Sequence, residues 1–245
     1  MPDFASSPEN NVSHAVIPGA GSAGLTWEPA SRLLPVRVLS VPDEPTVPEM
    51  AAALAAQAAE LPEPRVLTGA SLGAMVALEL AKLVPVQGLI LIATGFGITV
   101  GPSLLEWVAA APADLFEKMA KVSLADPENR EQVALTVRDF EARGQAVLLR
   151  HLRALGAYRP EPPANAPPTL VIWGEKDRSV PLADHVELAL KYRGALAPIA
   201  GAAHKPFFER PEETVSWMRR AASWAVAAAG DRTATGPRPG GTPPR

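Results

Sequence analysis

Apolar residues follow two periods along the chain, and their alternation predicts strands and helices in turn. Short apolar runs of the kind expected for buried parallel strands occur at 14–17, 36–41, 65–68, 89–93, 169–173 and 195–199. Helical spacing predicts helices at 27–34, 46–60, 72–83, 182–191 and from 211 onward. Because strands alternate with helices, we expect an α/β fold whose mostly parallel sheet has about six strands flanked by helices.

One long stretch departs from this alternation. Between 102 and 159 there is no strand-like run, and apolar residues such as Leu104, Leu105 and Val108 recur at helical spacing. A proline-rich return to the core follows at 160–168. The pattern predicts an α/β core made of 1–101 and 160–229, with a helical cap insertion at 102–159. It also predicts a disordered tail at 230–245.

Composition narrows the class of protein. Of 245 residues, 47% are hydrophobic and 20% charged, as in ordinary globular proteins, and a net charge of −3 gives no electrostatic reason to bind nucleic acid or anionic membranes. The absence of cysteine excludes disulfides and thiolate catalysis. The first 14 residues lack the basic start and apolar stretch of a signal peptide, so we expect none there, and no apolar run is long enough to span a bilayer. We therefore expect a cytoplasmic monomer or homodimer whose partner is a small-molecule substrate.

The stretch at 66–81 carries the most informative motif. Its turn matches G-x-S-x-G at Gly69, Ser71 and Gly73, between a predicted strand and a predicted helix. In a nucleophile elbow of this kind the serine hydroxyl projects above the sheet, and glycines allow the strand and helix to approach closely. The motif indicates a nucleophilic serine at 71, while an ordinary buried strand-to-helix turn is the simpler alternative.

A second glycine-rich loop allows a different interpretation. Gly19, Gly21 and Gly24 have the G-x-G-x-x-G spacing after a predicted strand, and Asp43 follows about 20 positions later, as in dinucleotide-binding folds. The alternative is that backbone N–H groups of this loop point toward an oxyanion that develops during catalysis. Both interpretations place a ligand at the same edge of the sheet.

Two further strand ends carry groups that could activate a serine. Asp177 follows the fifth predicted strand and His204 the sixth, so both should lie at the same edge as Ser71. A serine needs a base, and a neutral imidazole serves best when a carboxylate orients it. Glu175 competes with Asp177 for the role of the acid. The remaining histidines, at positions 14, 151 and 185, are expected to be structural or solvated, and no cluster has the spacing of metal ligands.

At this point the chain resembles a known family. The segments PGAGSAGLTW, GASLGAMVALELA, LVIWGEKDRSVP and GAAHKPFFERPEE look like those of α/β-hydrolases of the capped esterase, lactonase and C–C hydrolase type, and the similarity runs over 16–224. The resemblance implies Ser71 as nucleophile, His204 as base, Asp177 as acid, and an oxyanion hole formed by the N–H groups of Leu72 and Ala20. It implies no cofactor and no metal.

The sequence departs from the family pattern at two places. Pro18-Gly19 stands where the family often has His-Gly, which leaves the oxyanion donor open between Ala20 and its neighbours. The first predicted strand matches the third strand of the family, so we expect a sheet that lacks the usual first hairpin.

Three functions fit these residues. The first is a serine hydrolase that cleaves a carboxylic ester, lactone or thioester of a small to medium organic substrate through an acyl-serine. The second is a C–C bond hydrolase, lyase or cyclase that uses Ser71, His204 and Asp177 for proton transfer. The third is a non-catalytic binding protein on the same fold. Fold alone does not choose among them.

Overall fold

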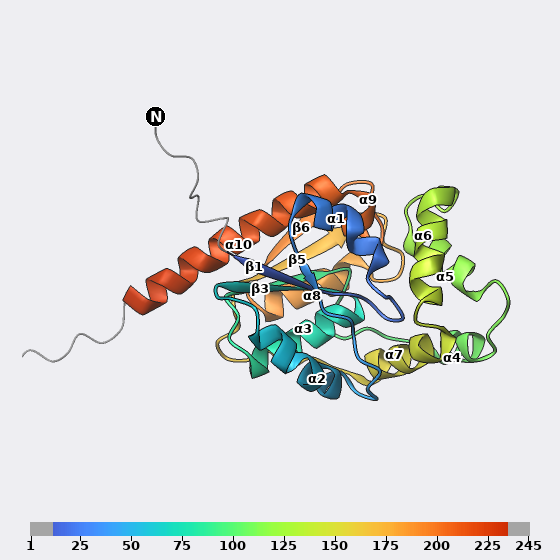
Figure 1. The fold of residues 1–245 in the computed structure, drawn as a ribbon, viewed down its shortest axis with the longest axis horizontal. Coiled ribbons are helices and arrows are strands. Elements are labelled where there is room, and N and C mark those ends of the chain that lie inside the picture. The colour runs from blue at the N-terminus through green and yellow to red at the C-terminus, as the bar shows by residue number, and fades with distance from the viewer. Residues whose placement is uncertain (1–11, 235–245) are drawn as a thin grey trace, which may run out of the picture.

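The sheet has six strands, all paired in parallel (Figure 1). The computed structural model of the chain describes residues 12–234. In sheet order the strands are β2 (Arg37–Val38), β1 (Ser13–Ile17), β3 (Arg65–Ala70), β4 (Gly88–Ile92), β5 (Thr169–Gly174) and β6 (Ala195–Ile199). The predicted fold class is therefore confirmed.

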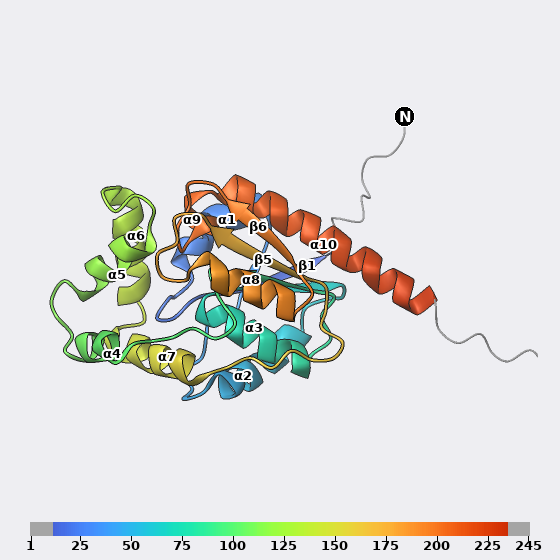
Figure 2. The same cartoon turned by 180° about the vertical axis from the view of Figure 1, so that it is seen from behind.

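Helices cover both faces of the sheet, so its central strands are buried (Figures 1 and 2). One face carries α2 (Val47–Ala59), α3 (Leu72–Leu83) and α8 (Leu182–Lys191). The other face carries a 3-10 turn (Leu25–Trp27), α1 (Glu28–Leu33), α9 (Pro206–Glu209) and α10 (Pro211–Ala234). The burial of aliphatic side chains on each face supplies most of the driving force for this arrangement.

Four more helices lie together at one end of the molecule, and we call them the α4–α7 segment (Figures 1 and 2). Its helices are α4 (Pro102–Ala109), α5 (Leu115–Ser123), α6 (Arg130–Glu141) and α7 (Gln145–Ala157). Val108, Leu115, Leu148 and Leu152 form a small apolar core of its own. The helices expected between 102 and 159 are therefore present, and their role as a cap stays a prediction.

Local sequence signals account for several element ends. The Thr46 hydroxyl accepts a hydrogen bond from the Glu49 N–H at the start of α2, as the capping box there predicts. Pro198 lies in β6, an edge strand, where a missing N–H is tolerated.

Two boundaries differ from the sequence prediction. The strand predicted at 36–41 pairs only at Arg37–Val38, because its partner strand β1 is followed at once by Pro18, which has no N–H to continue the ladder. At the other end of the chain, α10 continues to Ala234, past the start of the tail predicted at 230–245. The remainder of that tail, 235–245, lies outside the described residues.

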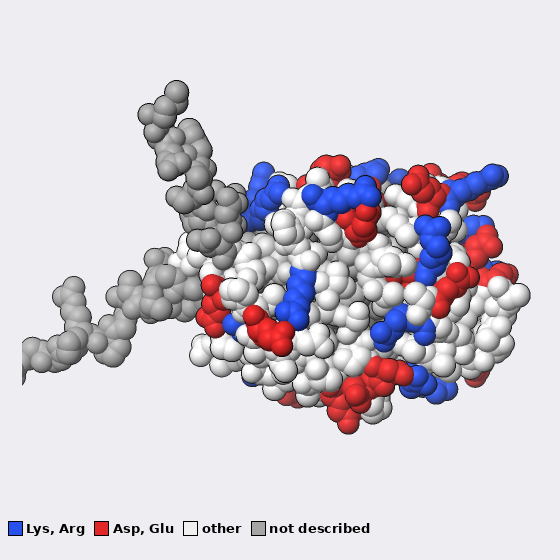
Figure 3. Space-filling model, viewed as in Figure 1, with Lys and Arg blue, Asp and Glu red and all other residues white. Residues whose placement is uncertain are grey.

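On the face shown in Figure 3, acidic and basic side chains are interspersed, so this face has no large patch of a single charge sign. Within 12–234, no helix combines the length and the apolar character needed to cross a bilayer.

Candidate active site

The turn between β3 and α3 holds Ser71 in an uncommon backbone conformation, with φ 53° and ψ −118°. The glycines on either side make this turn possible. A Cβ on Gly73 would lie 2.0 Å from the Ile17 carbonyl oxygen, and one on Gly69 would lie 2.3 Å from the Gly73 carbonyl oxygen. Strain of this kind persists only where the surrounding structure enforces it, and it is common at functional sites.

His204 and Asp177 meet at the same edge of the sheet. The Nδ1 atom of His204 lies 2.8 Å from Asp177 Oδ2, while Asp177 Oδ1 accepts hydrogen bonds from the Ser179 and Val180 N–H groups at 2.8 and 3.2 Å. Burial raises the pKa of Asp177, but the His204 ring and the two N–H donors outweigh burial, so this pKa lies below its ordinary value. The carboxylate is thus ionised and placed to fix the imidazole tautomer.

Glu209, which the sequence prediction missed, organises the loop that carries His204. Its buried carboxylate accepts hydrogen bonds from the N–H groups of Ala203, Lys205 and Ala125, at 2.8, 3.3 and 2.5 Å. The His204 N–H donates to the Ser123 carbonyl oxygen at 3.1 Å. The imidazole is therefore positioned by contacts with both α9 and the α4–α7 segment.

The loop after β1 lies beside the serine. A Cβ on Gly19 would lie 3.5 Å from Ser71 Cβ, and Ala20 lines the same cavity as Ser71. Leu72 is the first residue of α3, and the first N–H groups of a helix have no partner within it. The assignment of the oxyanion hole to Ala20 and Leu72 stays a prediction that this placement allows.

The dinucleotide interpretation of the same loop fits the structure poorly. The Gly21 N–H donates to His151 Nδ1 at 3.1 Å, and Asp43, the expected ribose ligand, pairs with Arg150. The loop amide of Gly21 and the Asp43 carboxylate are therefore occupied by side chains of the α4–α7 segment.

Asp139 joins the α4–α7 segment to this loop, and sequence reasoning missed it. Its fully buried carboxylate accepts four hydrogen bonds from the loop and the adjoining 3-10 turn. The donors are Ser22 Oγ at 2.6 Å, Ala23 N at 3.0 Å, Leu25 N at 2.8 Å and Thr26 Oγ1 at 3.2 Å. The only signal in the sequence is one acidic residue on the otherwise buried face of α6.

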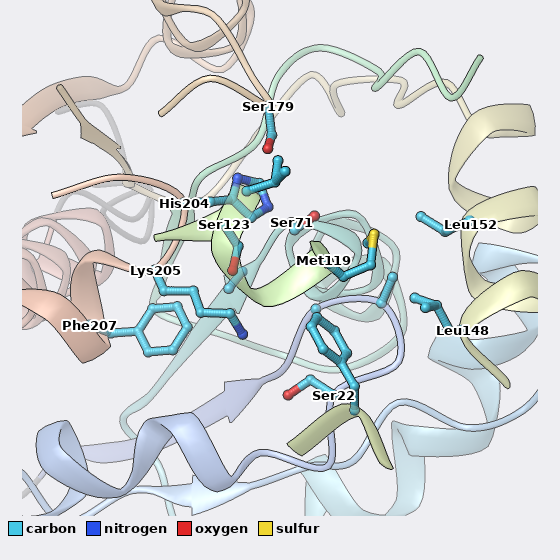
Figure 4. Close-up of a pocket in the computed structure, with 15 residues that line it drawn as sticks. Ser22, Ser71, Met119, Ser123, Leu148, Leu152, Ser179, His204, Lys205 and Phe207 are labelled. Atoms are coloured by element: carbon cyan, nitrogen blue, oxygen red, sulfur yellow. The ribbon is translucent and has the colours of Figure 1, made fainter. Parts of the chain in front are cut away.

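A cavity of about 120 Å³ connects these groups (Figure 4). Ser71 and His204 line one part of it, and Figure 4 shows both side chains near each other, with Leu148 and Leu152 from α7 across the cavity. Most of the remaining wall comes from Gly19, Ala20, Ser22, Ala70, Met119, Val122, Ser123, Phe140, Ser179, Lys205 and Phe207. Residues from the sheet edge and from the α4–α7 segment thus enclose one mostly apolar space.

The other three histidines are buried in the fold. Burial lowers the pKa of His151 and of His185, and burial together with Arg219 lowers the pKa of His14 to about 4. These histidines are therefore neutral near pH 7. Within the part of the chain that the structure describes, no group of three His, Asp or Glu side chains could hold a metal ion.

Solved structures with a similar fold include hydrolases. An esterase from Exiguobacterium antarcticum aligns with a TM-score of 0.76 at 15% identity, covering 86% of this chain and 92% of that one. A thermophilic esterase gives 0.73 at 22% identity, with 87% and 90% coverage. Est816, described as an N-acyl homoserine lactone degrading enzyme, gives 0.70 at 20% identity, with 85% and 92% coverage. At these identities the likeness establishes the fold alone.

The comparison with curated protein sequences gives no match. The family model described as the alpha/beta hydrolase family matches residues 16–217, which is most of the sequence. The resemblance noted from the motifs is therefore confirmed, and the chain belongs to the alpha/beta hydrolase family.

Proposed function

We propose that the protein is a serine hydrolase that cleaves carboxylic esters, or the related lactones or thioesters, through an acyl-serine intermediate. The observation that carries the proposal is the placement of Ser71 and the His204–Asp177 pair on one cavity at the carboxyl edge of the sheet. The family and the esterase and lactonase neighbours support a hydrolase.

Each group has a role that follows from its chemistry. Ser71 Oγ attacks the carbonyl carbon while the His204 imidazole takes its proton, and Asp177 stabilises the imidazolium that forms. The N–H groups of Leu72 and Ala20 are assigned to the oxyanion of the tetrahedral intermediate. His204 then protonates the departing alcohol, and water, activated by the same imidazole, releases the acid from the serine.

The test compares Ser71→Ala with Ser103→Ala, an exposed serine at the start of α4, on a series of p-nitrophenyl esters of increasing acyl length, a lactone and a thioester. We expect Ser71→Ala to lower kcat by about 10⁴- to 10⁶-fold with little change in KM, because the lost interaction exists mainly in the transition state. Ser103→Ala should keep wild-type kinetics. An organophosphonate should add its mass to the peptide that contains Ser71.

Retention of more than about a hundredth of the wild-type turnover by Ser71→Ala would exclude an acyl-serine, because attack by water with His204 as base would then suffice. Turnover of a vinylogous diketone without turnover of any ester would favour the C–C hydrolase function instead.

A further inference from the structure

The cavity contains one buried cation that the proposed mechanism does not use. Lys205 follows His204 directly, and its side chain is only 8% exposed. In Figure 4 this side chain passes between Phe207 and Ser123, and its nitrogen lies on the side of Ser22. An ammonium in such a place needs partners, because removing a charge from water is costly unless hydrogen bonds or an opposite charge compensate for it.

Side chains of the protein compensate only in part for the lost hydration of the Lys205 ammonium. An ammonium has three donors, and strong charge-assisted N–H···O bonds measure about 2.7–2.9 Å. Among the described residues, the polar contacts of Lys205 Nζ are Thr26 Oγ1 at 3.5 Å and Asp139 Oδ2 at 4.0 Å. The ring of Phe140 lies 5.3 Å away, at the range of a cation–π contact.

Asp139 does not approach Lys205 more closely because other donors hold it. Its two oxygens accept four shorter hydrogen bonds from 22–26, and these fix the carboxylate on the loop. Burial lowers the pKa of Lys205, against the opposing effects of Asp139 and Glu209. The ammonium is therefore held beside the cavity with donor capacity that the described protein atoms leave unused.

The rest of the cavity wall favours an anion as the missing partner. Among the described residues that line it there is no Asp or Glu, and most of the others are apolar or carry a hydroxyl group. Lys205 is the only Lys, Arg, Asp or Glu in this lining set. A negative group would meet a cation and no carboxylate in the cavity wall, because Asp139, whose Oδ2 lies 4.0 Å from Lys205 Nζ, is not among the lining residues. A charge-assisted bond is about twice as strong as a neutral one.

We propose that Lys205 is a specificity residue that binds a free carboxylate on the substrate, a few atoms from the ester carbonyl that Ser71 attacks. The proposal rests on the proposed hydrolase function and deepens it by naming a substrate class, esters that carry a carboxylate. The carboxylate belongs either to the acyl part, as in a dicarboxylic monoester, or to the alcohol part, as in an ester of a hydroxy acid. The size of the cavity, about 120 Å³, favours short chains.

Two matched pairs of esters test this substrate class. Monoethyl succinate is paired with ethyl levulinate, and acetoxyacetate with acetoxyacetone, so that in each pair a methyl ketone replaces the carboxylate at nearly equal size. The readout is the ratio of kcat/KM for the acid to kcat/KM for the ketone. We expect the wild-type ratio to exceed ten for at least one pair, which also identifies the side of the ester that reaches Lys205.

Lys205→Met should lower this ratio at least tenfold, because the charge-assisted bond is lost only for the acid. Lys118→Met, an exposed lysine of α5 paired with Asp114, should leave the ratio unchanged. Asp139→Asn should not lower it, since the amide can keep bonds to the loop while the competing negative charge disappears. If Lys205→Met does not fold, the charge-balanced Lys205→Met/Asp139→Asn variant takes its place, with the same expected loss.

Equal losses on the acid and the ketone would overturn the proposal and make Lys205 a structural partner of Asp139. A wild-type preference for the ketones would overturn it as well.

Binding separates this proposal from the proposed function. N-ethylsuccinamate, the amide counterpart of monoethyl succinate, should bind Ser71→Ala and bind Ser71→Ala/Lys205→Met at least tenfold more weakly, as measured by calorimetry. Such binding without hydrolysis of any ester would refute the hydrolase and leave the carboxylate site. Equal or absent binding by the two variants, with ester hydrolysis intact in the wild type, would refute the carboxylate site alone.

Discussion

The two sides of the cavity are held in different ways. At the sheet edge, the Ser71 turn is fixed by main-chain contacts so close that Gly73 has no room for a methyl group against Ile17. The α4–α7 segment is attached mainly through side chains, above all Asp139 and His151, which bond to the glycine-rich loop. Two main-chain bonds add to these, from the N–H groups of Ala23 and His204 to the carbonyl oxygens of Asp139 and Ser123. The backbone therefore positions Ser71, the proposed nucleophile. Side chains, which can be substituted, largely position the α4–α7 wall of the cavity, where we propose that the substrate binds.

The largest effect should come from Gly73→Ala, which tests the backbone side of the comparison. The added methyl would meet the carbonyl oxygens of Ile17 and Pro18 at 2.0 and 2.4 Å, so β1 or α3 must shift. We expect urea denaturation to show a loss of more than about 5 kcal/mol, which few single substitutions reach, together with loss of the proposed esterase activity.

Gly101→Ala is the matched control, since nothing lies within 4 Å of its added Cβ and its φ of −69° suits alanine. It should change the free energy of unfolding by less than about 0.5 kcal/mol. Similar stability of the two variants would show that the turn is less constrained than its geometry indicates.

Asp139→Ala should have the next largest effect, because it tests the side-chain attachment. The substitution removes four hydrogen bonds and leaves the buried Lys205 without its counter-charge, a change that typically costs about 3–5 kcal/mol. We expect faster proteolysis within the α4–α7 segment and a lower urea midpoint. Asp139→Asn, which keeps most of the bonding capacity, should lose clearly less; equal losses would mean that the negative charge of Asp139, and not its hydrogen bonds to the loop, supplies this stability.

Acid should have the smallest effect of the three, and part of this effect should arise on the sheet side, at His14. Burial and Arg219 hold the pKa of His14 at about 4, whereas an unfolded histidine titrates near 6.5. The unfolded state therefore binds the proton first, so this contribution to stability is complete above about pH 6.5 and declines as pH falls toward 4. The loss between pH 7 and pH 5 should be about 2 kcal/mol.

His14→Phe should remove that part of the acid dependence in urea titrations at the two pH values. An unchanged pH dependence in this variant would assign the acid sensitivity to His151 at the α4–α7 segment or to His185, whose pKa values burial also lowers.

The contrast between the two regions also explains what could be predicted from sequence. The Ser71 turn follows from consecutive residues, since Gly69, Ser71 and Gly73 impose their geometry locally. The capping of α2 by Thr46 is equally local. The meeting of Asp177 with His204 follows from a general rule, because parallel strands end at one edge.

What sequence reasoning missed depends on partners far away in the chain. Asp139 is an unremarkable helix residue until its bonds to the loop, more than 110 positions earlier, are seen. Glu209 and Lys205 belong to the same sequence motif as His204. The hydrogen bonds of Glu209 to Ala125 and of Lys205 to Thr26 nevertheless cannot be deduced from spacing. A buried acid on an apolar helix face is the signal that could have drawn attention to Asp139.

The bond from Lys205 to Thr26 spans 179 positions, and His204 is held by a carbonyl oxygen of α5. Such distant contacts form late in folding, because the entropy of closing a long loop is lost before the contact can stabilise the chain. During synthesis Ser71 and its turn emerge long before His204, so a growing chain carries the proposed nucleophile without the proposed base. We expect the nascent protein to stay inert toward esters until α9 has left the ribosome and docked against the loop after β1.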